Sequence, residues 1–278
     1  MVNYIIRKVY DICPVLERSQ KFNVKGTLAV PYYPYDANNI TVSYQEEFTD
    51  MESTTGSISS VNLTGYLAGA LTKVSRSLLN NSDIDLVGFV TDEMAQAIAR
   101  FIEHELLIGT PADNTTDPVT PAKVLGLSTL NNKITLASAS AITADDVVKL
   151  QGKVKDQFQR DAIWIMHPST REALRLLKDN MGHYMLNPDF TAPYGWNMLG
   201  KPVYVSDNMP EIGGGNTVIY YGDMKGLATK FNEEINIQVL RERYAPQHAL
   251  GIVGWFEFDS KVIDEQQIAK LVMGTASV

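Results

Sequence analysis

The 278-residue chain has a single cysteine, Cys13, so no disulfide can form within it. Its four histidines, His104, His167, His183 and His248, are scattered along the sequence, and none stands in the ligand spacing of a known metal motif. No neighbour in sequence would activate the Cys13 thiolate. We therefore expect no metal site, and we interpret Cys13 as a free structural thiol.

Positive charge and long apolar runs are also scarce. The chain has 24 Lys and Arg against 32 Asp and Glu, a net charge of -8, which does not favour tight contact with phosphate backbones or an anionic membrane. No run approaches the about 18 apolar residues that a membrane helix needs. The first residues, MVNYIIRKVYDICPVLER, lack the pattern of a signal peptide. We expect an unexported protein with no membrane partner and only weak contact with nucleic acid.

Familiar catalytic motifs are missing as well. The sequence has no GxSxG elbow, Walker loop or GxGxxG, and the glycines at 213–215 precede a strand-like segment rather than the helix that a phosphate cradle needs. Glu46, Glu47, Asp50 and Glu52 stand in a polar tract typical of a solvated loop. We therefore predict no catalytic, cofactor-binding or metal-binding residues, and no cofactor.

Aromatic residues gather at one place, where Tyr32, Tyr33 and Tyr35 alternate with Pro31 and Pro34. Such rings can stack nucleic-acid bases, but that kind of site also needs basic residues, which this stretch lacks. Packing or a contact between subunits is the better interpretation.

The strongest enzymatic hypothesis rests on two polar residues at strand ends, His167 and Asp223, used as in an α/β hydrolase. Asp223 follows Gly222 in the stretch VIYYGDMKG, and an Asp at that position is typical of a turn in which the side chain bonds to nearby backbone. We favour the turn, because no nucleophile motif accompanies the two residues.

Residues 27–67 form the most unusual segment. Two alternating runs, ITVSY and SISSVNLTGY, flank the polar tract EEFTDMESTTGS, which predicts a long two-stranded ribbon. An isolated ribbon of two strands is marginal in water. We expect this arm to rest on something else, such as another subunit.

A long helix is predicted over residues 80–108, with Ser82 or Asp83 as its N-cap and Gly109 as its stop. At 1.5 Å per residue it would be roughly 40 Å long, a structural spine. Its apolar face repeats at spacings of three and four, through Val87, Val90, Met94, Ile98 and Phe101.

The rest of the chain alternates helical and extended patterns. A Pro-rich loop over residues 110–135 precedes a block that predicts a compact α/β unit. Thr143 and Asp146 are expected to open one helix there, and a capping box of Ser169 with Glu172 is expected to open a second helix that ends near Asn180. The predicted strands cover residues 162–166, 201–207, 216–223, 235–243, 251–259 and 261–274.

Four stretches in this order resemble the tailed-bacteriophage major capsid proteins of the Hong Kong 97 type. They are KVSRSLLNNSDIDLVGFVTDEMAQAIARFIEHELLIGT, RDAIWIMHPSTREALRLLKDNMGHYM, NMLGKPVYVSDNMP and VIYYGDMKG. The resemblance implies an α+β, Hong Kong 97-like fold. The implied parts are an N-terminal arm (1–26), an extended E-loop (27–67), a peripheral domain (68–135) with the spine helix, an axial domain (136–222) and a return to the peripheral domain (223–278).

The function implied by the resemblance is that of a major capsid protein of a tailed phage or prophage. Copies would self-assemble through pentamers and hexamers into an icosahedral head around double-stranded DNA. Implied partners are scaffolding, portal and maturation protease proteins, with DNA held by weak contact. The implied location is the virion, after assembly in the host bacterial cytoplasm.

Two further points follow from the resemblance. Some members join subunits through an E-loop lysine, but this chain has no lysine between Lys25 and Lys73, so we expect no such isopeptide crosslink. The alternative with the same fold is an encapsulin-type compartment, which encloses enzyme cargo instead of DNA.

Overall fold

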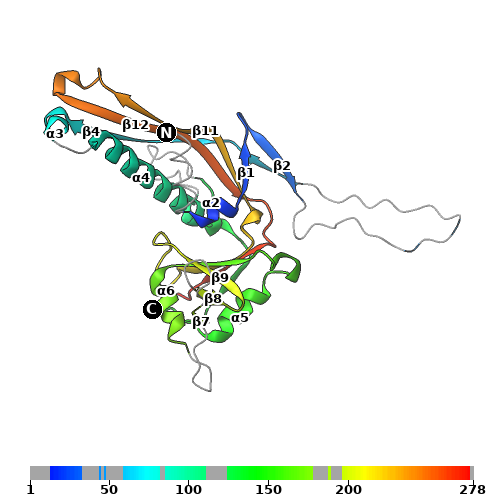
Figure 1. The fold of residues 1–278 in the computed structure, drawn as a ribbon. Coiled ribbons are helices and arrows are strands. Elements are labelled where there is room, and N and C mark those ends of the chain that lie inside the picture. Colours follow the sequence, from blue (N-terminus) through cyan, green and yellow to red (C-terminus); the bar gives the residue numbers. More distant parts are fainter. Residues whose placement is uncertain are drawn as a thin grey trace.

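The computed structural model describes residues 13–32, 44, 47, 59–81, 85–110, 124–177, 187–188 and 196–275, which we call the described part of the chain. Helices and strands are mixed, and the strands form sheets of four, seven and two strands (Figure 1). The predicted α+β class is confirmed.

The four-stranded sheet has the order β1-β11-β12-β4. Its strands are β1 (Gln20–Asn23), β11 (Leu227–Leu240), β12 (Ala249–Val262) and β4 (Tyr66–Ser75). β1 runs parallel to β11, and the other pairs are antiparallel. β4 shows the alternating burial expected of a strand with one face on a core. The sheet therefore has one covered face and one exposed face.

The spine helix α4 (Leu86–Ile108) covers the inner face of this sheet (Figure 1). Helix and sheet approach closely at Gly254, where a Cβ atom would lie 3.1 Å from the Met94 sulfur and 3.2 Å from Ile98 Cδ1. Phe101 is partly exposed, yet its ring makes edge-to-face contacts with Phe256 and Phe258. The predicted apolar face is the one that packs.

The start of this helix differs from the prediction. Asp85 is the N-cap, because its side chain accepts a hydrogen bond from the Gly88 amide at 3.1 Å. The helix therefore begins at Leu86 rather than at residue 80. A separate short helix, α3 (Arg76–Asn80), precedes it.

The seven-stranded sheet has the order β5-β13-β10-β6-β9-β8-β7. Its strands are β5 (Lys133–Thr135), β13 (Ile268–Val272), β10 (Thr217–Gly222), β6 (Ile163–Met166), β9 (Lys201–Val205), β8 (Trp196–Met198) and β7 (Asn187–Pro188). Two helices, α5 (Ala144–Gly152) and α6 (Pro168–Arg175), contribute buried residues to the apolar cluster that contains Trp164 and Tyr221. This unit is the predicted α/β block.

The predicted opening of a helix by Thr143 and Asp146 is confirmed, whereas the predicted capping box of Ser169 and Glu172 is wrong. Thr143 and Asp146 form a capping box at the start of α5. At α6, His167 is the N-cap and Pro168 occupies the first turn, so Ser169 is already inside the helix. The helix also ends at Arg175, earlier than predicted.

The predicted strand over residues 261–274 is interrupted. β12 ends at Val262, a turn follows, and β13 begins at Ile268. Asp264 makes the turn: its carboxylate accepts hydrogen bonds from the Gln266 amide at 3.0 Å and from Gln267 Nε2 at 2.9 Å. The turn lets the chain leave the four-stranded sheet and enter the seven-stranded one.

The remaining short elements connect the sheets and the arm. They are α2 (Pro14–Arg18), η1 (Leu127–Thr129), η2 (Asp156–Phe158), η4 (Met224–Gly226) and η5 (Ala245–Gln247), with the arm strands β2 (Leu28–Tyr32) and β3 (Ser59–Leu63). β2 and β3 pair antiparallel as a separate two-stranded sheet that projects from the molecule (Figure 1). The second run of the predicted ribbon, SISSVNLTGY, contains β3, whose partner is β2, while the first predicted run, ITVSY, lies outside the described residues apart from Tyr44.

Candidate functional site

The two residues of the enzymatic hypothesis lie at opposite ends of one strand pair. β6 and β10 are antiparallel, with Met166 opposite Ile219 and Ile163 opposite Gly222. His167 follows the first pair and Asp223 follows the last, so they are roughly 15 Å apart along the strands. The structure does not bring them together, and the geometric basis of the hydrolase hypothesis is absent.

Asp223 is a turn residue. Its side chain accepts a hydrogen bond from the Lys225 amide at 3.0 Å and caps the short helix η4. The preceding residue, Gly222, has φ +143°, and a Cβ atom there would lie 2.0 Å from the Gln267 carbonyl oxygen. Only glycine fits this corner. The chain passes here from β10 of the seven-stranded sheet to β11 of the four-stranded sheet.

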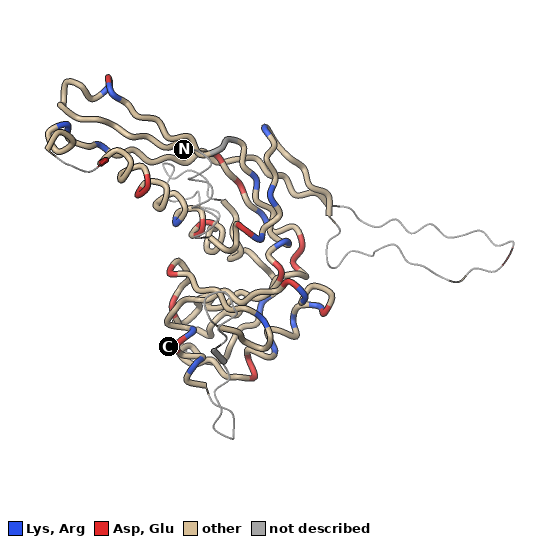
Figure 2. The backbone as a smooth tube through the Cα atoms, in the orientation of Figure 1, with Lys and Arg blue, Asp and Glu red and all other residues tan. Residues whose placement is uncertain are grey.

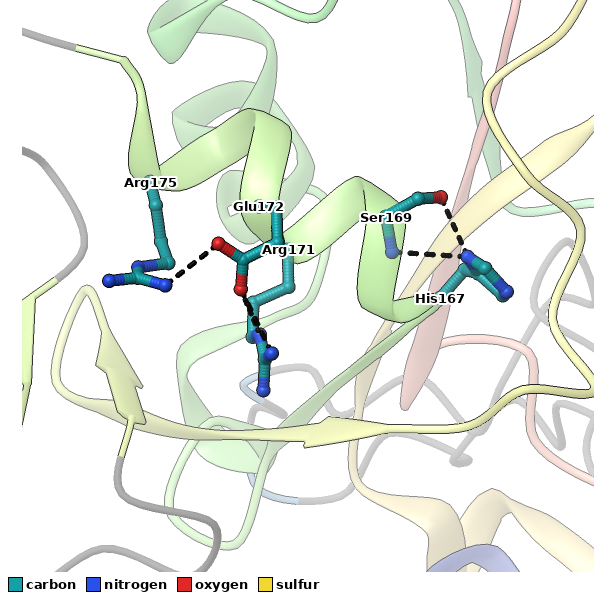
Figure 3. Close-up of polar contacts among 5 residues, drawn as sticks. All are labelled: His167, Ser169, Arg171, Glu172 and Arg175. Carbon is teal, nitrogen blue, oxygen red and sulfur yellow. Dashed lines mark hydrogen bonds and ion pairs between the residues drawn. The ribbon is translucent and has the colours of Figure 1, made fainter.

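His167 has a structural role in α6. Its Nδ1 accepts from the Ser169 amide at 3.1 Å and lies 2.6 Å from the Ser169 hydroxyl (Figure 3). On the same helix Glu172 pairs with Arg171 at 2.9 Å and with Arg175 at 2.7 Å (Figure 3). The Arg175 guanidinium lies 4.3 Å from the centre of the Trp196 ring. This polar cluster stabilises the helix and holds Trp196 against it.

An open pocket of about 810 Å³ lies beside Asp223. Its charged lining consists of Glu17, Arg18, Asp161, Asp223 and Lys225, and Lys225 forms ion pairs with Asp161 at 2.8 Å and Asp223 at 3.8 Å. Figure 2 shows charged residues of both signs gathered in this region, where the two sheets meet. The carboxylates of Asp161 and Asp223 are therefore occupied by pairing with Lys225.

Among the residues that the structure describes, the other candidates from the sequence form no site. Cys13 is buried at the N-cap of α2, and burial raises the pKa of its thiol well above the usual range. His104 lies 3.5 Å from Glu105, and His248 adopts a left-handed turn conformation after η5. Within the described part of the chain, no three His, Cys, Asp or Glu residues gather as metal ligands would.

Several predicted features lie outside the described residues: Tyr33, Pro34, Tyr35, Glu46, Asp50, Glu52, His183, Asn180, Ser82 and Asp83. Pro31 and Tyr32 belong to β2, and Glu47 is exposed. The glycines at 213–215 form the predicted turn before β10. No described helix is both long enough and apolar enough to cross a membrane.

Polar residues of the four-stranded sheet bond to the root of the arm, which we define as residue 26 and residues 62–64. The sequence patterns did not predict this feature. Lys230 is fully buried, and its ammonium group donates to the carbonyl oxygens of Gly26, Leu63 and Thr64. Asp259 lies opposite Lys230 in the β11–β12 pair and accepts a hydrogen bond from the Thr64 amide at 2.7 Å. Only the alternation of β11 and β12, which places both side chains on one face, could have hinted at this pair.

A second buried carboxylate joins the spine helix to the seven-stranded sheet. Glu103 on α4 accepts a hydrogen bond from Asn208 Nδ2 at 2.7 Å, in the loop that follows β9. Burial raises the pKa of the Glu103 carboxyl group, the nearby Asp207 charge adds to this, and hydrogen bonds from Ser206 and Asn208 oppose it. Glu103 therefore links α4 to the loop after β9 by a buried hydrogen bond.

The outer face of the four-stranded sheet carries exposed apolar side chains. Leu67 and Leu71 on β4 and Trp255 on β12 are 63%, 51% and 48% exposed. Val253 pairs with Leu71, and Trp255 pairs with Gly69 between the two leucines, so the apolar side chains share one face. An apolar strip of this kind on a sheet is typical of a surface that contacts another protein.

The fold consists of a spine helix packed on a sheet, an attached α/β unit, a two-stranded arm and an exposed apolar strip. These features are typical of a structural subunit rather than of an enzyme of the hydrolase type. The sequence matches the phage capsid family over residues 5–273, nearly the whole chain. The chain belongs to the phage capsid family. No curated protein matches it by sequence.

Solved structures share the fold. The capsid of a native GTA particle, computed with C5 symmetry, has a TM-score of 0.77 at 19% identity and covers 94% of this chain and 90% of that chain. A chain from Microbacterium phage Oxtober96 has a TM-score of 0.69 at 18% identity, with 94% and 91% covered. A chain from Gordonia phage Cozz has a TM-score of 0.67 at 12% identity, with 94% and 86% covered.

The predicted capsid-type fold is therefore confirmed, and so is the predicted function of a phage major capsid protein that forms an icosahedral shell. The virion is its location. The family and the fold indicate a structural role, and the similar capsid structures with five-fold symmetry support self-assembly into an oligomeric shell.

Proposed function

We propose that this chain is the repeating subunit of a tailed-phage head that encloses double-stranded DNA. The observation that carries the proposal is the family match over residues 5–273, together with the β2–β3 ribbon, which pairs with no other described strand (Figure 1). A two-stranded ribbon gains little stability alone, so it needs a surface on another subunit. The arm is assigned to that contact.

The parts of the subunit follow the family arrangement. Residues 1–26 are the N-terminal arm, 27–67 the E-loop, 68–135 the peripheral domain, 136–222 the axial domain, and 223–278 the return to the peripheral domain. The passage from one sheet to the other at Asp223 supports the last division. The apolar cluster around Trp164 supports a separate axial part, while the cluster around α4 also includes Ile163, Ile165 and Tyr220 of the seven-stranded sheet and so joins the two parts.

Contacts with other molecules follow from charge and surface. The net charge of -8 favours weak contact with packaged DNA, which suits a container whose contents must leave. Pentamers and hexamers of this chain form the shell, while scaffolding, portal and maturation protease proteins act during assembly in the bacterial cytoplasm.

Electron microscopy and light scattering of the purified protein test the proposal. We expect closed shells or their pentameric and hexameric parts, with scattering that increases with protein concentration. A strictly monomeric protein at every concentration and salt tested, with and without its scaffolding partner, would contradict it.

Neighbouring genes separate the phage head from an encapsulin-type compartment. Portal, terminase and protease genes beside this one are expected for a head. A gene for a peroxidase or ferritin-like cargo enzyme, without those phage genes, would favour the compartment instead.

A further inference from the structure

The root of the arm is joined to the subunit by side chains rather than by strand pairing. β2 and β3 pair only with each other among the described strands, and β12 lies beside β3 without a ladder between them. Polar side chains from β11 and β12 bond to the arm backbone where β2 begins and β3 ends. The direction of the arm thus depends on a few side-chain hydrogen bonds.

Lys230 bonds to the backbone beside both strands of the arm, β2 and β3. Its ammonium group donates to Gly26, just before β2, and to Leu63 and Thr64 at the end of β3, with distances of 3.3 and 2.7 Å for the last two. These three acceptors use all three donors of the ammonium group. Because the side chain is fully buried, water does not compete for these bonds.

Asp259 bonds to Thr64, which is also bound by Lys230. Its Oδ2 atom accepts from the Thr64 amide at 2.7 Å and from the Thr64 hydroxyl at 3.4 Å, while Lys230 bonds to the Thr64 carbonyl. Since Lys230 and Asp259 are cross-strand partners, their side chains project from the same side of the sheet. Thr64 is thereby fixed in both position and orientation.

Two further hydrogen bonds extend this arrangement. Asn232 Nδ2 donates to the Thr64 carbonyl at 3.1 Å, and Lys261 Nζ donates to the Asn62 carbonyl at 2.6 Å. Both lie nearer the solvent than Lys230. Lys230 and Asp259 therefore form the buried centre of the attachment.

We propose that Lys230 and Asp259 are positioning residues that fix the direction in which the arm leaves the subunit, and that shell assembly depends on this direction. This inference rests on the proposed function, because it assigns the arm a contact with a neighbouring subunit. A buried pair of opposite charges is often replaceable by apolar residues without loss of stability. Its directional hydrogen bonds, in contrast, have no apolar equivalent.

The double variant Lys230→Met/Asp259→Leu removes both charges and keeps an apolar core of similar volume. We expect it to fold with a thermal midpoint close to that of the parent. Spin labels at Ser60→Cys on β3 and Gln238→Cys on β11 report the arm direction, since both positions are exposed. Cys13 is buried and should remain unlabelled. The parent should give one narrow distance distribution, and the double variant a broad one together with loss of assembly.

A narrow distribution in the double variant would overturn the proposal, whether or not assembly is lost. Normal assembly with a broad distribution would overturn it too, because the arm direction would then not matter. The variant Lys149→Met, on the exposed side of α5, is the matched control for loss of a lysine and should leave the distance distribution unchanged.

Single variants add a second measurement. Lys230→Met alone removes the donors to Gly26, Leu63 and Thr64 but keeps the buried Asp259 carboxyl group, so we expect a lower thermal midpoint than in the double variant. Equal midpoints in the two variants would show that Asp259 alone does not destabilise the fold. If the parent fails to assemble under every condition, the proposed function fails, while the distance measurements still test whether these residues hold the arm.

Discussion

At the scale of single residues, Gly222 makes the corner at which the chain passes from the seven-stranded to the four-stranded sheet. Its φ of +143° and the nearby Gln267 carbonyl leave no space for a Cβ atom. We predict that Gly222→Ala lowers the free energy of unfolding by about 2–4 kcal/mol, since backbone strain and overlap add. Urea unfolding followed by circular dichroism measures the loss.

Gly152 is the matched control for this substitution. It ends α5, and a Cβ atom there would contact nothing within 4 Å. Gly152→Ala should leave stability unchanged or raise it slightly, because alanine favours a helix. Equal losses for the two variants would show that the Gly222 corner is not constrained.

The Cys13 thiol permits another test at this scale. It is fully buried, and burial raises its pKa, so little thiolate forms in the folded protein at neutral pH. We predict that a thiol reagent modifies Cys13 only after denaturant is added, and that one thiol per chain then reacts. Rapid modification of the folded protein would mean that α2 opens readily.

At the scale of elements, Glu103 links α4 to the loop after β9 in a pH-dependent way. Its folded-state pKa is raised above the ordinary 4.5, first by burial and then by Asp207. The folded protein therefore binds the proton more tightly than the unfolded chain does. Its contribution to stability is fully present below pH 4.5 and is lost as the pH rises through the folded pKa.

The variant Glu103→Gln tests this sign. Glutamine keeps an oxygen that accepts from Asn208 but carries no charge. We predict that the stability of the parent, measured by urea unfolding, falls relative to that of Glu103→Gln as the pH is raised from 4.5 towards neutrality. A parent that gains stability relative to the variant over this range would show that Glu103 is charged and well solvated in the fold.

At the scale of the whole molecule, the exposed strip of Leu67, Leu71 and Trp255 should act in contacts between subunits. We predict that Leu67→Lys/Leu71→Lys leaves the free energy of unfolding within about 0.5 kcal/mol of the parent, because both side chains face solvent in the single subunit. Assembly, followed by light scattering, should weaken strongly, because a lysine would be buried at the contact.

The double variant Leu67→Met/Leu71→Met is the control for the strip. It keeps an apolar surface of similar volume, so shells should form as in the parent. If the lysine variant assembles as well as the methionine variant, the strip lies on a free surface of the shell.

Short-range patterns determined much of this protein. The spacing of Met94 and Ile98 predicted the buried face of the spine helix, Thr143 and Asp146 predicted the start of α5, and the Gly-Asp pair at 222–223 predicted a turn. Each of these depends on residues close together in the sequence, where helical period and capping chemistry are decisive. The order of such patterns also sufficed to indicate the capsid family.

Only the tertiary structure decided the features that depend on distant residues. Lys230 bonds to residues 26, 63 and 64, and Glu103 bonds to Asn208, contacts across more than 100 positions that no periodicity reveals. The separation of His167 from Asp223 likewise follows from the antiparallel pairing of β6 with β10. A strand pattern fixes which face a residue occupies, but the pairing of strands fixes which distant groups it meets.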